Sequence, residues 1–202
     1  MLSEDKRIHT KEDLREWLAL EYRRYPLTAR HILPYLFQWS EGAILRRHTK
    51  LLRTTEYHFN NGHRLRAAWY NAWLMRLQLK TGMHLPINCY GKGLMLMHLH
   101  PIASNPHISV GENCRLMPFV KLAGDDVQGL APTVGDNVVL GIGCTLVGGI
   151  TLADGIIVGA GSVVTKSFLE PGIILAGVPA KKIGVREGWE APSLKDPGRE
   201  VL

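Results

Sequence analysis

Several features that would place this sequence in a common protein class are missing. No stretch of the 202 residues reaches the roughly 18 consecutive apolar residues that a transmembrane helix needs. Lys6, Arg7 and Lys11 are followed by an amphipathic segment rather than by an apolar core, so no signal peptide is predicted. Histidine is absent beyond His107. A metal-dependent hydratase, which needs about three converging histidine ligands, is therefore disfavoured, and no metal site is predicted.

Cysteine is also scarce, which bears on the compartment. The chain has only 3 cysteines, at Cys89, Cys114 and Cys144. An odd number at wide spacing does not suggest a disulfide framework. We expect buried free thiols, as in the reducing environment of a cytoplasmic protein.

Charge is distributed unevenly along the chain. Residues 1–90 hold 15 Lys and Arg against 8 Asp and Glu, a balance of +7, whereas residues 91–202 hold 9 against 10, a balance of −1. The basic half is either a solvated helical surface or a region that attracts an acidic glycan, a membrane surface or a phosphorylated cofactor. No recognisable nucleic-acid-binding module accompanies the charge, so no nucleic acid is expected as a partner. Membrane association is not expected or, where it occurs, is expected to be peripheral.

A repeat of six residues dominates residues 134–164, which read VGDNVV LGIGCT LVGGIT LADGII VGAGSV V. The fifth residue of each unit is small or branched, and the second is mostly tiny. The first is always apolar: Val134, Leu140, Leu146, Leu152, Val158 and Val164. A six-residue period of this kind is typical of a parallel β-helix.

The period fixes which residues should stack on one another. Three units would close one coil, and coils would stack about 4.8 Å apart, placing Leu140 under Val158 and Leu146 under Val164. The frame extends backwards through units at 116–121 and 110–115, and more loosely through 104–109 and 98–103. Residues 125–133 break the pattern and are predicted to form a loop at a corner.

The N-terminal part has helical rather than six-residue periodicity. Thr10 followed by Glu12 and Asp13 predicts a helix start, and Pro26 its end. A less regular segment with Pro34 runs from 31 to 39. Further helices are predicted over about 41–58, with apolar residues Ile44, Leu45, Leu51 and Leu52, and over about 64–79, with Leu65, Ala68, Trp69, Ala72 and Leu77.

The predicted architecture has three parts. Residues 1–82 are expected to be α-helical, with Gly82 ending the last helix. Residues 83–184 are expected to form the β-helix, and residues 185–202, rich in proline and charge, a C-terminal tail.

Three segments together resemble the hexapeptide-repeat acyltransferases, and among them the serine acetyltransferases. They are the six-residue frame, the run GLMLMHLHPIASNPHISVGENCRL at 93–116, and the ending AGVPAKKI at 176–183. Within that group the chain is most similar to the short serine-acetyltransferase-like proteins associated with polysaccharide synthesis. The resemblance covers about residues 40–184. It implies an all-β left-handed parallel β-helix behind an N-terminal α-helical domain, a homotrimer, and acetyl-CoA bound in the groove between adjacent subunits.

The resemblance also implies a catalytic base. A histidine in that family lies seven residues before the Asn-Pro that opens the next unit, and Asn105-Pro106 places it at His98. An imidazole can take the proton from an acceptor hydroxyl as that hydroxyl attacks a thioester. His100 is the alternative base if the first coil slips its register. By position alone, His98 falls on an inward first position and could instead be a core residue.

Residues for acetyl-CoA follow from the same resemblance. Glycines and an alanine would line the groove wall for the pantetheine arm, lysines would meet the phosphates, and a Pro-Ala pair would meet the adenine. These residues are Gly141, Gly143, Gly159, Ala160, Gly161, Lys166, Pro179, Ala180, Lys181 and Lys182. The alternative for the glycines is that corner geometry alone requires them.

Two departures from the serine acetyltransferases bear on the acceptor. Met97 stands where they carry an Asp before the catalytic His, and the run Gly129-Leu130-Ala131-Pro132 stands where they carry Asp-Arg-His-Pro. No carboxylate partner for His98 is evident, although Asp125, Asp126 or a backbone carbonyl would serve. The departures favour acetylation of a sugar or glycan hydroxyl and predict that L-serine is a poor acceptor. The alternatives are serine O-acetylation for cysteine synthesis and a non-catalytic trimeric scaffold.

Overall fold

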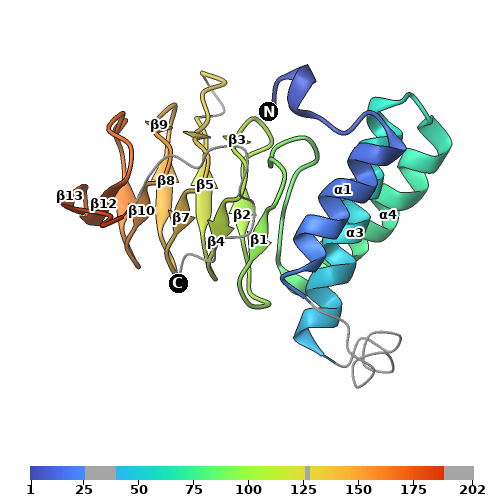
Figure 1. The fold of residues 1–202 in the computed structure, drawn as a ribbon, viewed down its shortest axis with the longest axis horizontal. Helices are drawn as coiled ribbons and strands as arrows, with labels where there is room; N and C mark the ends of the chain where they lie inside the picture. The colour runs from blue at the N-terminus through green and yellow to red at the C-terminus, as the bar shows by residue number, and fades with distance from the viewer. Residues whose placement is uncertain (26–39, 126–127, 189–202) are drawn as a thin grey trace.

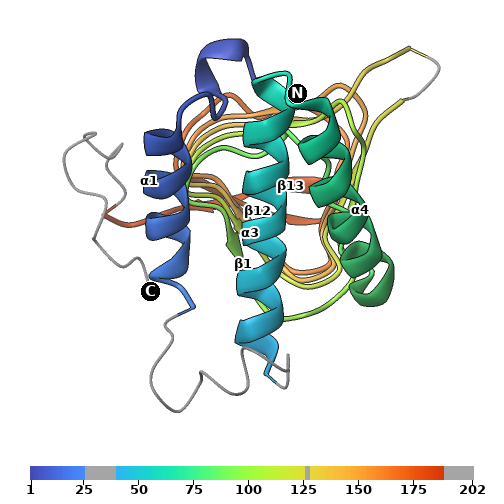
Figure 2. The ribbon, with the colours of Figure 1, turned by 90° about the vertical axis from the view of Figure 1, so that its right-hand side faces the viewer.

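A layer of helices covers one end of a coiled stack of short strands (Figure 1). The structure, a computed structural model, describes residues 1–25, 40–125 and 128–188. A 3-10 turn, η1 (Glu4–Lys6), precedes α1 (Lys11–Tyr22), α3 (Glu41–Asn60) and α4 (Arg64–Thr81). Figure 2 shows these three helices side by side across the end of the coil, with α3 between α1 and α4. The helices therefore cover the end of the first coil.

The helix boundaries follow from local signals that the sequence carries. At the start of α1, Asp13 N donates to Thr10 Oγ1 at 3.0 Å and Thr10 N donates to Asp13 Oδ2 at 2.8 Å, which is a capping box. At the end of α4, Gly82 adopts a left-handed φ of 70°. Both boundaries are confirmed. Pro26 and the segment 31–39 lie outside the described residues.

The inner face of α4 differs from the predicted one. Only Leu77 of the predicted apolar set is buried, and the other buried residues are Ala67 and Leu74. Leu65 is 89% exposed and Trp69 is 65% exposed. The prediction was wrong because apolar residues lie on every side of this helix, so their spacing does not select one face.

The strands form three ladders, one on each side of a coil, as a left-handed parallel β-helix requires. Neighbouring strands are parallel except at the end of the six-stranded sheet, where β12 and β13 pair antiparallel. The six-stranded sheet has the order β1-β4-β7-β10-β12-β13, the four-stranded sheet β11-β8-β5-β2, and the three-stranded sheet β3-β6-β9. The predicted fold class is confirmed. The strands are β1 (Met95–Leu96), β2 (Ala103–Ser104), β3 (Ser109–Val110), β4 (Arg115–Leu116), β5 (Lys121–Ala123), β6 (Thr133–Val134), β7 (Val139–Leu140), β8 (Thr145–Val147), β9 (Thr151–Leu152), β10 (Ile157–Val158), β11 (Val163–Val164), β12 (Ile173–Gly177) and β13 (Ala180–Val185).

The six-residue frame sets the register of these ladders. Val158 pairs with Leu140 and Val164 pairs with Leu146, as the period predicts. All the first and fifth positions of 134–164 are buried. Among them Cys144 is a free buried thiol, and burial raises its pKa to about 12. The thiol therefore stays protonated and acts as a small apolar residue.

The first coil departs from the predicted frame. Leu96 pairs with Leu116, but the next stacked residue is Ser104, which pairs with Leu122. Eight residues rather than six separate Leu96 from Ser104, so the predicted unit 98–103 was wrong by two residues. The extra residues lie between β1 and β2, at a corner, where the backbone bulges outward without disturbing the stacked strands.

A buried ion cluster joins the helices to the first coil. Arg53 of α3 is fully buried and bonds Glu21 of α1, at 2.7 Å, and Glu56 of α3, at 2.9 Å. Its guanidinium also donates to the carbonyls of Tyr90 and Gly91, at 2.9 and 2.8 Å. Because one side chain contacts two helices and the coil, these parts are held in a fixed relation.

The two carboxylates of this cluster are themselves tied to the coil. Leu94 N donates to Glu21 at 3.2 Å, and Asn88 N donates to Glu56 at 2.8 Å. Burial alone would lower the pKa of Arg53, but the two carboxylates raise it above its ordinary value. Arg53 therefore stays charged, and its loss would leave two buried carboxylates without a counter-charge.

Replacing Arg53 should therefore destabilise the protein strongly. We expect Arg53→Met to lower the free energy of unfolding by about 3–5 kcal/mol, the usual result of removing one partner of a buried ion pair. Arg15→Met is the matched control, because Arg15 and its partner Glu12 are both exposed, and it should change stability by less than about 0.5 kcal/mol. Urea unfolding measures both. Similar midpoints for the two variants would contradict this role of Arg53.

A second buried group should make stability depend on pH. His48 of α3 is fully buried with Nε2 3.3 Å from Met83 O, and burial lowers its pKa to about 4. The unfolded chain binds this proton near pH 6.5, so the histidine's contribution to stability is complete above that pH and is lost as pH falls towards 4.

We expect wild type to lose about 2 kcal/mol more stability than His48→Leu between pH 7 and pH 5. Urea unfolding at the two pH values measures the difference. Parallel losses in the two proteins would show that His48 does not titrate on unfolding.

Candidate active site

Most of the predicted site residues lie along one edge of the coil. The chain turns from the six-stranded to the four-stranded sheet at 97–102, 117–120, 141–144 and 159–162. We call these four stacked turns the His98 corner. His98 and His100 lie on its first level, and the predicted cofactor glycines lie on its third and fourth levels. Two separate predictions, for the base and for the cofactor, therefore meet on one edge.

Backbone hydrogen bonds hold successive levels of the His98 corner together. The donors and acceptors are Phe119 N to Pro101 O, Gly143 N to Pro118 O and Gly161 N to Ile142 O, at 2.8–2.9 Å. Since coils stack about 4.8 Å apart, the first and fourth levels are roughly 14 Å apart along the axis. An extended arm lying along the corner would pass from one to the other.

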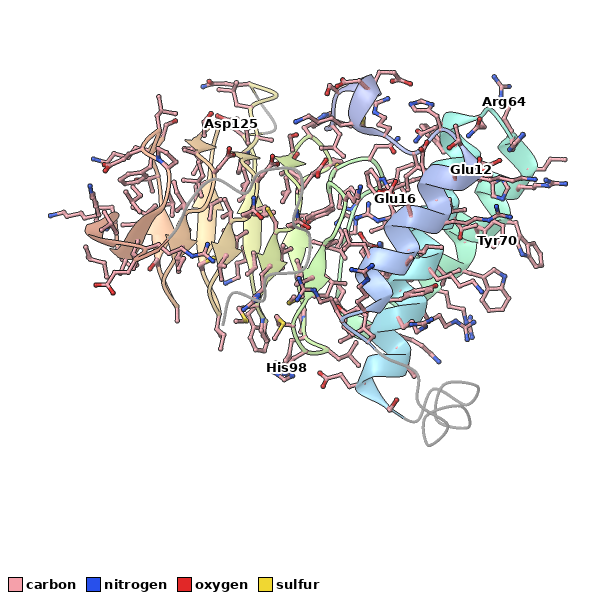
Figure 3. All side chains as sticks on the ribbon, in the orientation of Figure 1. Glu12, Glu16, Arg64, Tyr70, His98 and Asp125 are labelled. Carbon is pink, nitrogen blue, oxygen red and sulfur yellow. The ribbon has the colours of Figure 1, made fainter. Side chains whose placement is uncertain are left out.

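His98 points outward and faces a carboxylate. Its side chain is 63% exposed, and its Nδ1 lies 3.4 Å from Glu41 Oε2. The other carboxylate oxygen of Glu41 accepts a hydrogen bond from Leu99 N. The interpretation of His98 as a core residue was therefore wrong, because the two-residue insertion moves it off the inward position. Figure 3 shows it at the outer edge of the coil.

The fold positions Glu41 at the first turn of α3. Ser40 caps this helix, accepting from Ala43 N at 3.3 Å. The acid thus begins the helix that Arg53 fixes to the first coil. A carboxylate that accepts from Nδ1–H leaves the lone pair of Nε2 free, which is the arrangement that a general base needs. The 3.4 Å contact is long for a hydrogen bond, but such contacts often shorten when substrate binds, so the distance does not exclude a catalytic role.

Sequence reasoning missed Glu41 and proposed loop acids instead. Asp125 lies in the loop after β5 and, in Figure 3, on the opposite side of the coil from His98. Asp126 lies outside the described residues. Glu41 is 57 residues from His98, and no spacing rule connects them. The available signal was an acid directly after a Ser cap, which marked a helix start.

His100 has a different environment. Its ring packs on Phe119 with 5.0 Å between centroids. In the described part of the chain, no carboxylate lies within ion-pair distance of His100. The His100 side chain is exposed, and its ring contact with Phe119 is apolar.

The predicted cofactor glycines have two different explanations. A Cβ on Gly141 would lie 2.5 Å from Val158 O, so the close approach of two coils already requires glycine there. Gly143 and Gly161 have φ near 65° and open space around the missing Cβ. Gly143, Gly161 and the exposed Ala160 carry no side chain larger than a methyl group, so a ligand can approach the backbone at these residues. At Gly159 a Cβ would lie 3.1 Å from Leu175 O, which is tight but less so than at Gly141.

The hairpin of β12 and β13 closes the far end of the corner. Gly177 N donates to Ser162 Oγ at 3.2 Å, which seats the hairpin turn on the fourth level. Pro179 is exposed in this turn, whereas Ala180 is only 3% exposed and offers its backbone alone. Lys181 and Lys182 follow on β13 and are exposed.

The predicted lysines are not all brought together within one chain. Lys182 Nζ bonds Glu170 at 2.6 Å. Lys166 follows β11, past the four-stranded sheet, and lies over the Phe168 ring at 5.4 Å. It is therefore separated from the His98 corner by the width of that sheet.

The described residues offer neither a metal-binding cluster nor a helix that could span a membrane. No group of three potential ligand side chains suited to a metal ion occurs among residues 1–25, 40–125 and 128–188. None of the helices described is both long and apolar enough to cross a bilayer.

Comparisons with known proteins agree with the fold. No family model matches the chain. By sequence, it is 34% identical over 99 residues to mitochondrial serine acetyltransferase 3 of Arabidopsis thaliana, covering 48% of this chain and 25% of that protein. It is 25% identical over 162 residues to serine acetyltransferase of Buchnera aphidicola subsp. Acyrthosiphon pisum, covering 79% of this chain and 56% of that protein.

The solved structures extend the similarity to most of the chain. Soybean serine acetyltransferase complexed with serine has a TM-score of 0.64 at 23% identity, covering 84% of this chain and 69% of that one. Serine acetyltransferase from Brucella abortus in complex with coenzyme A has a TM-score of 0.60 at 22% identity, covering 86% of this chain and 67% of that one. The chain spans only 25–56% of the length of four curated serine acetyltransferases that it matches. It therefore shares the fold of the serine acetyltransferases, a left-handed parallel β-helix of six-residue repeats behind a layer of helices.

Proposed function

We propose that this protein is an acetyl-CoA-dependent O-acetyltransferase with His98 as its general base. The observation that carries the proposal is the outward-facing pair of His98 and Glu41 at one end of the His98 corner. At the other end of this corner, Gly143 and Gly161 leave the backbone accessible to a ligand. The similarity to serine acetyltransferases supports the same chemistry.

The proposed reaction is a direct transfer. His98 Nε2 takes the proton of the acceptor hydroxyl as its oxygen attacks the thioester carbonyl carbon. The carbon–sulfur bond then breaks, and the imidazolium returns the proton to the leaving CoA sulfur. The Glu41 carboxylate stabilises the imidazolium and keeps the ring oriented during both steps. No covalent acyl-enzyme is needed.

The co-substrate would lie along the His98 corner. Gly143, Ala160 and Gly161 would let the pantetheine arm approach the backbone, and Pro179 with Lys181 would meet the nucleotide end. Lys166 lies away from this edge, so we propose that the groove forms between adjacent subunits of a homotrimer, where a second chain completes its wall. The complex of the Brucella abortus relative with coenzyme A supports the choice of ligand.

L-serine is the acceptor that the comparisons favour. The sequence relatives are serine acetyltransferases, and the soybean relative is complexed with serine. Glu41 supports this choice because its half-exposed carboxylate beside His98 would attract an ammonium group. This acid supplies some of the charge that Met97 lacks.

A sugar or glycan hydroxyl is the second candidate. Met97 and the run 129–132 carry no charge where the resemblance leads us to expect an acid, an arginine and a histidine. An acceptor without ammonium and carboxylate groups needs fewer charged partners. The comparisons do not support this acceptor, so it ranks below serine.

The role proposed for His98 predicts a split between two neighbouring histidines. His98→Ala should lower kcat by roughly 10²–10⁴ while acetyl-CoA still binds, because removal of a general base has that cost. His100→Ala, the control, should lose much less. Steady-state rates and CoA calorimetry test both variants. If His98→Ala were fully active and His100→Ala were inactive, the general base would be His100 and not His98.

The role proposed for Glu41 predicts a loss in kcat rather than in stability. Glu41→Gln keeps an oxygen that can accept from Leu99 N but removes the charge that faces His98, so kcat should fall roughly tenfold or more. Glu12→Gln, on exposed α1, should leave kcat unchanged. Unfolding midpoints of both variants should match wild type. An unchanged kcat in Glu41→Gln would exclude Glu41 as the positioning residue.

The acceptor is tested by acetyl-CoA consumption with L-serine and with sugars and nucleotide sugars. We expect kcat/KM for L-serine of about 10⁴ M⁻¹s⁻¹ or more, the ordinary enzymatic range. A much lower value for serine together with a high value for a sugar would reverse the order of the two candidates. Turnover of none of them would refute O-acetylation of these acceptors.

A further inference from the structure

The outer side of α4 is apolar and basic, and no other described segment covers it. Its residues are spaced three or four apart on the side opposite the buried Ala67, Leu74 and Leu77. We define this outer face of α4 by Leu65, Trp69, Trp73, Arg76, Leu79 and Lys80, all of them exposed. Leu65 and Leu79 are 89% and 85% exposed, and the rings of Trp69 and Trp73 pack edge to face at 6.3 Å.

This face cannot be explained as ordinary solvated surface. Single exposed apolar residues are common, but two tryptophans and two leucines on one face of a helix form a contiguous apolar patch. Exposed patches of this kind mark interaction sites. One end of the patch borders an open hollow of about 350 Å³, which is lined by His58, Leu65, Arg66, Trp69 and Tyr70.

The charge on and around α4 is of one sign. Arg64, Arg66, Arg76 and Lys80 lie on the helix, which contains no acidic residue. Over 40–82, the acids are Glu41 and Glu56 only. Glu56 is buried against Arg53, and Glu41 lies beside His98. Glu12 and Glu16 lie on α1, which α3 separates from α4 (Figures 2 and 3). An anionic partner would therefore meet no repulsion at this face.

We propose that the outer face of α4 docks on the surface of an anionic phospholipid bilayer. Trp and Leu side chains enter the boundary between headgroups and acyl chains, while Arg76 and Lys80 contact lipid phosphates. The hollow next to Trp69, with Arg66 on its rim, offers a place for one headgroup. The protein lies on the membrane and does not cross it.

The face suits a bilayer better than it suits a second copy of itself. Two copies packed through this face would bring Arg76 and Lys80 of both chains together without an acid on either helix, which electrostatics disfavours. A bilayer supplies the opposite charge and an apolar interior at once. Figure 3 shows Arg64 and Tyr70 at the end of the molecule farthest from the coil, where a flat surface can reach them.

The proposal does not rest on acetyl transfer, but the proposed trimer would strengthen it. A threefold axis parallel to the coil axis would place three copies of α4 at the same end of the assembly. Weak individual contacts then add, because the second and third bind at high effective concentration.

The test is flotation of the full-length protein with vesicles. Wild type should float with vesicles of phosphatidylcholine mixed with phosphatidylglycerol, should not float with phosphatidylcholine alone, and should be released at high salt. The apolar variant Leu65→Ser with Trp69→Ser should lose the interaction. Arg76→Gln with Lys80→Gln should weaken it roughly thirtyfold, since each charge near a membrane contributes about a factor of five. All these side chains are exposed, so unfolding midpoints should stay at the wild-type value.

Leu169→Ser is the matched control, because Leu169 is equally apolar and 72% exposed but lies after β11, at the other end of the coil. It should float as wild type does. Failure of wild type to float with anionic vesicles would overturn the proposal, as would equal flotation of the apolar variant. A lower oligomeric mass of the apolar variant by light scattering would identify the face as an interface between copies instead. Binding to an acidic polysaccharide but not to vesicles would also refute it.

Discussion

The arrangement of the whole molecule depends on one buried guanidinium. Arg53 joins α1, α3 and the backbone of the first coil, and its two carboxylate partners are each tied to a backbone amide of that coil. Removing these charges from water is costly, and only a complete set of partners compensates for it. The helices are therefore fixed on the coil in one position, and the cluster specifies the geometry of the junction.

That position matters for the site because Glu41 lies on the same helix. Arg53 and Glu41 are 12 residues apart, about 18 Å along a rigid α-helix. Anchoring α3 at Arg53 therefore also sets where its first turn lies relative to the coil. The first coil positions His98, the partner of Glu41. Two extra residues at its corner place His98 on the outside of the coil, with a left-handed φ of 67°. A loop alone would hold neither group so firmly.

The coil was predictable because each coil repeats the same physical demand. The first residue of every unit must fill the same triangular interior of the β-helix. The sequence therefore predicted the period of six, the stacking of Leu140 under Val158 and the buried cysteines. The two-residue insertion after Leu96 was not predictable, since a corner tolerates extra residues without a change in the apolar pattern. The inner face of α4 was missed for the opposite reason, because its apolar residues surround the helix. Glu41 was missed because only the folded helix brings it to His98, across 57 residues.

In the proposed enzyme, the co-substrate lies along one edge of the coil, with the base at one end and the hairpin turn at the other. A crystal structure of the protein with coenzyme A tests this most directly. We expect the CoA sulfur beside His98 Nε2 and the pantetheine arm along Gly143, Ala160 and Gly161. Coenzyme A bound along a different corner, with its sulfur away from His98, would refute this path.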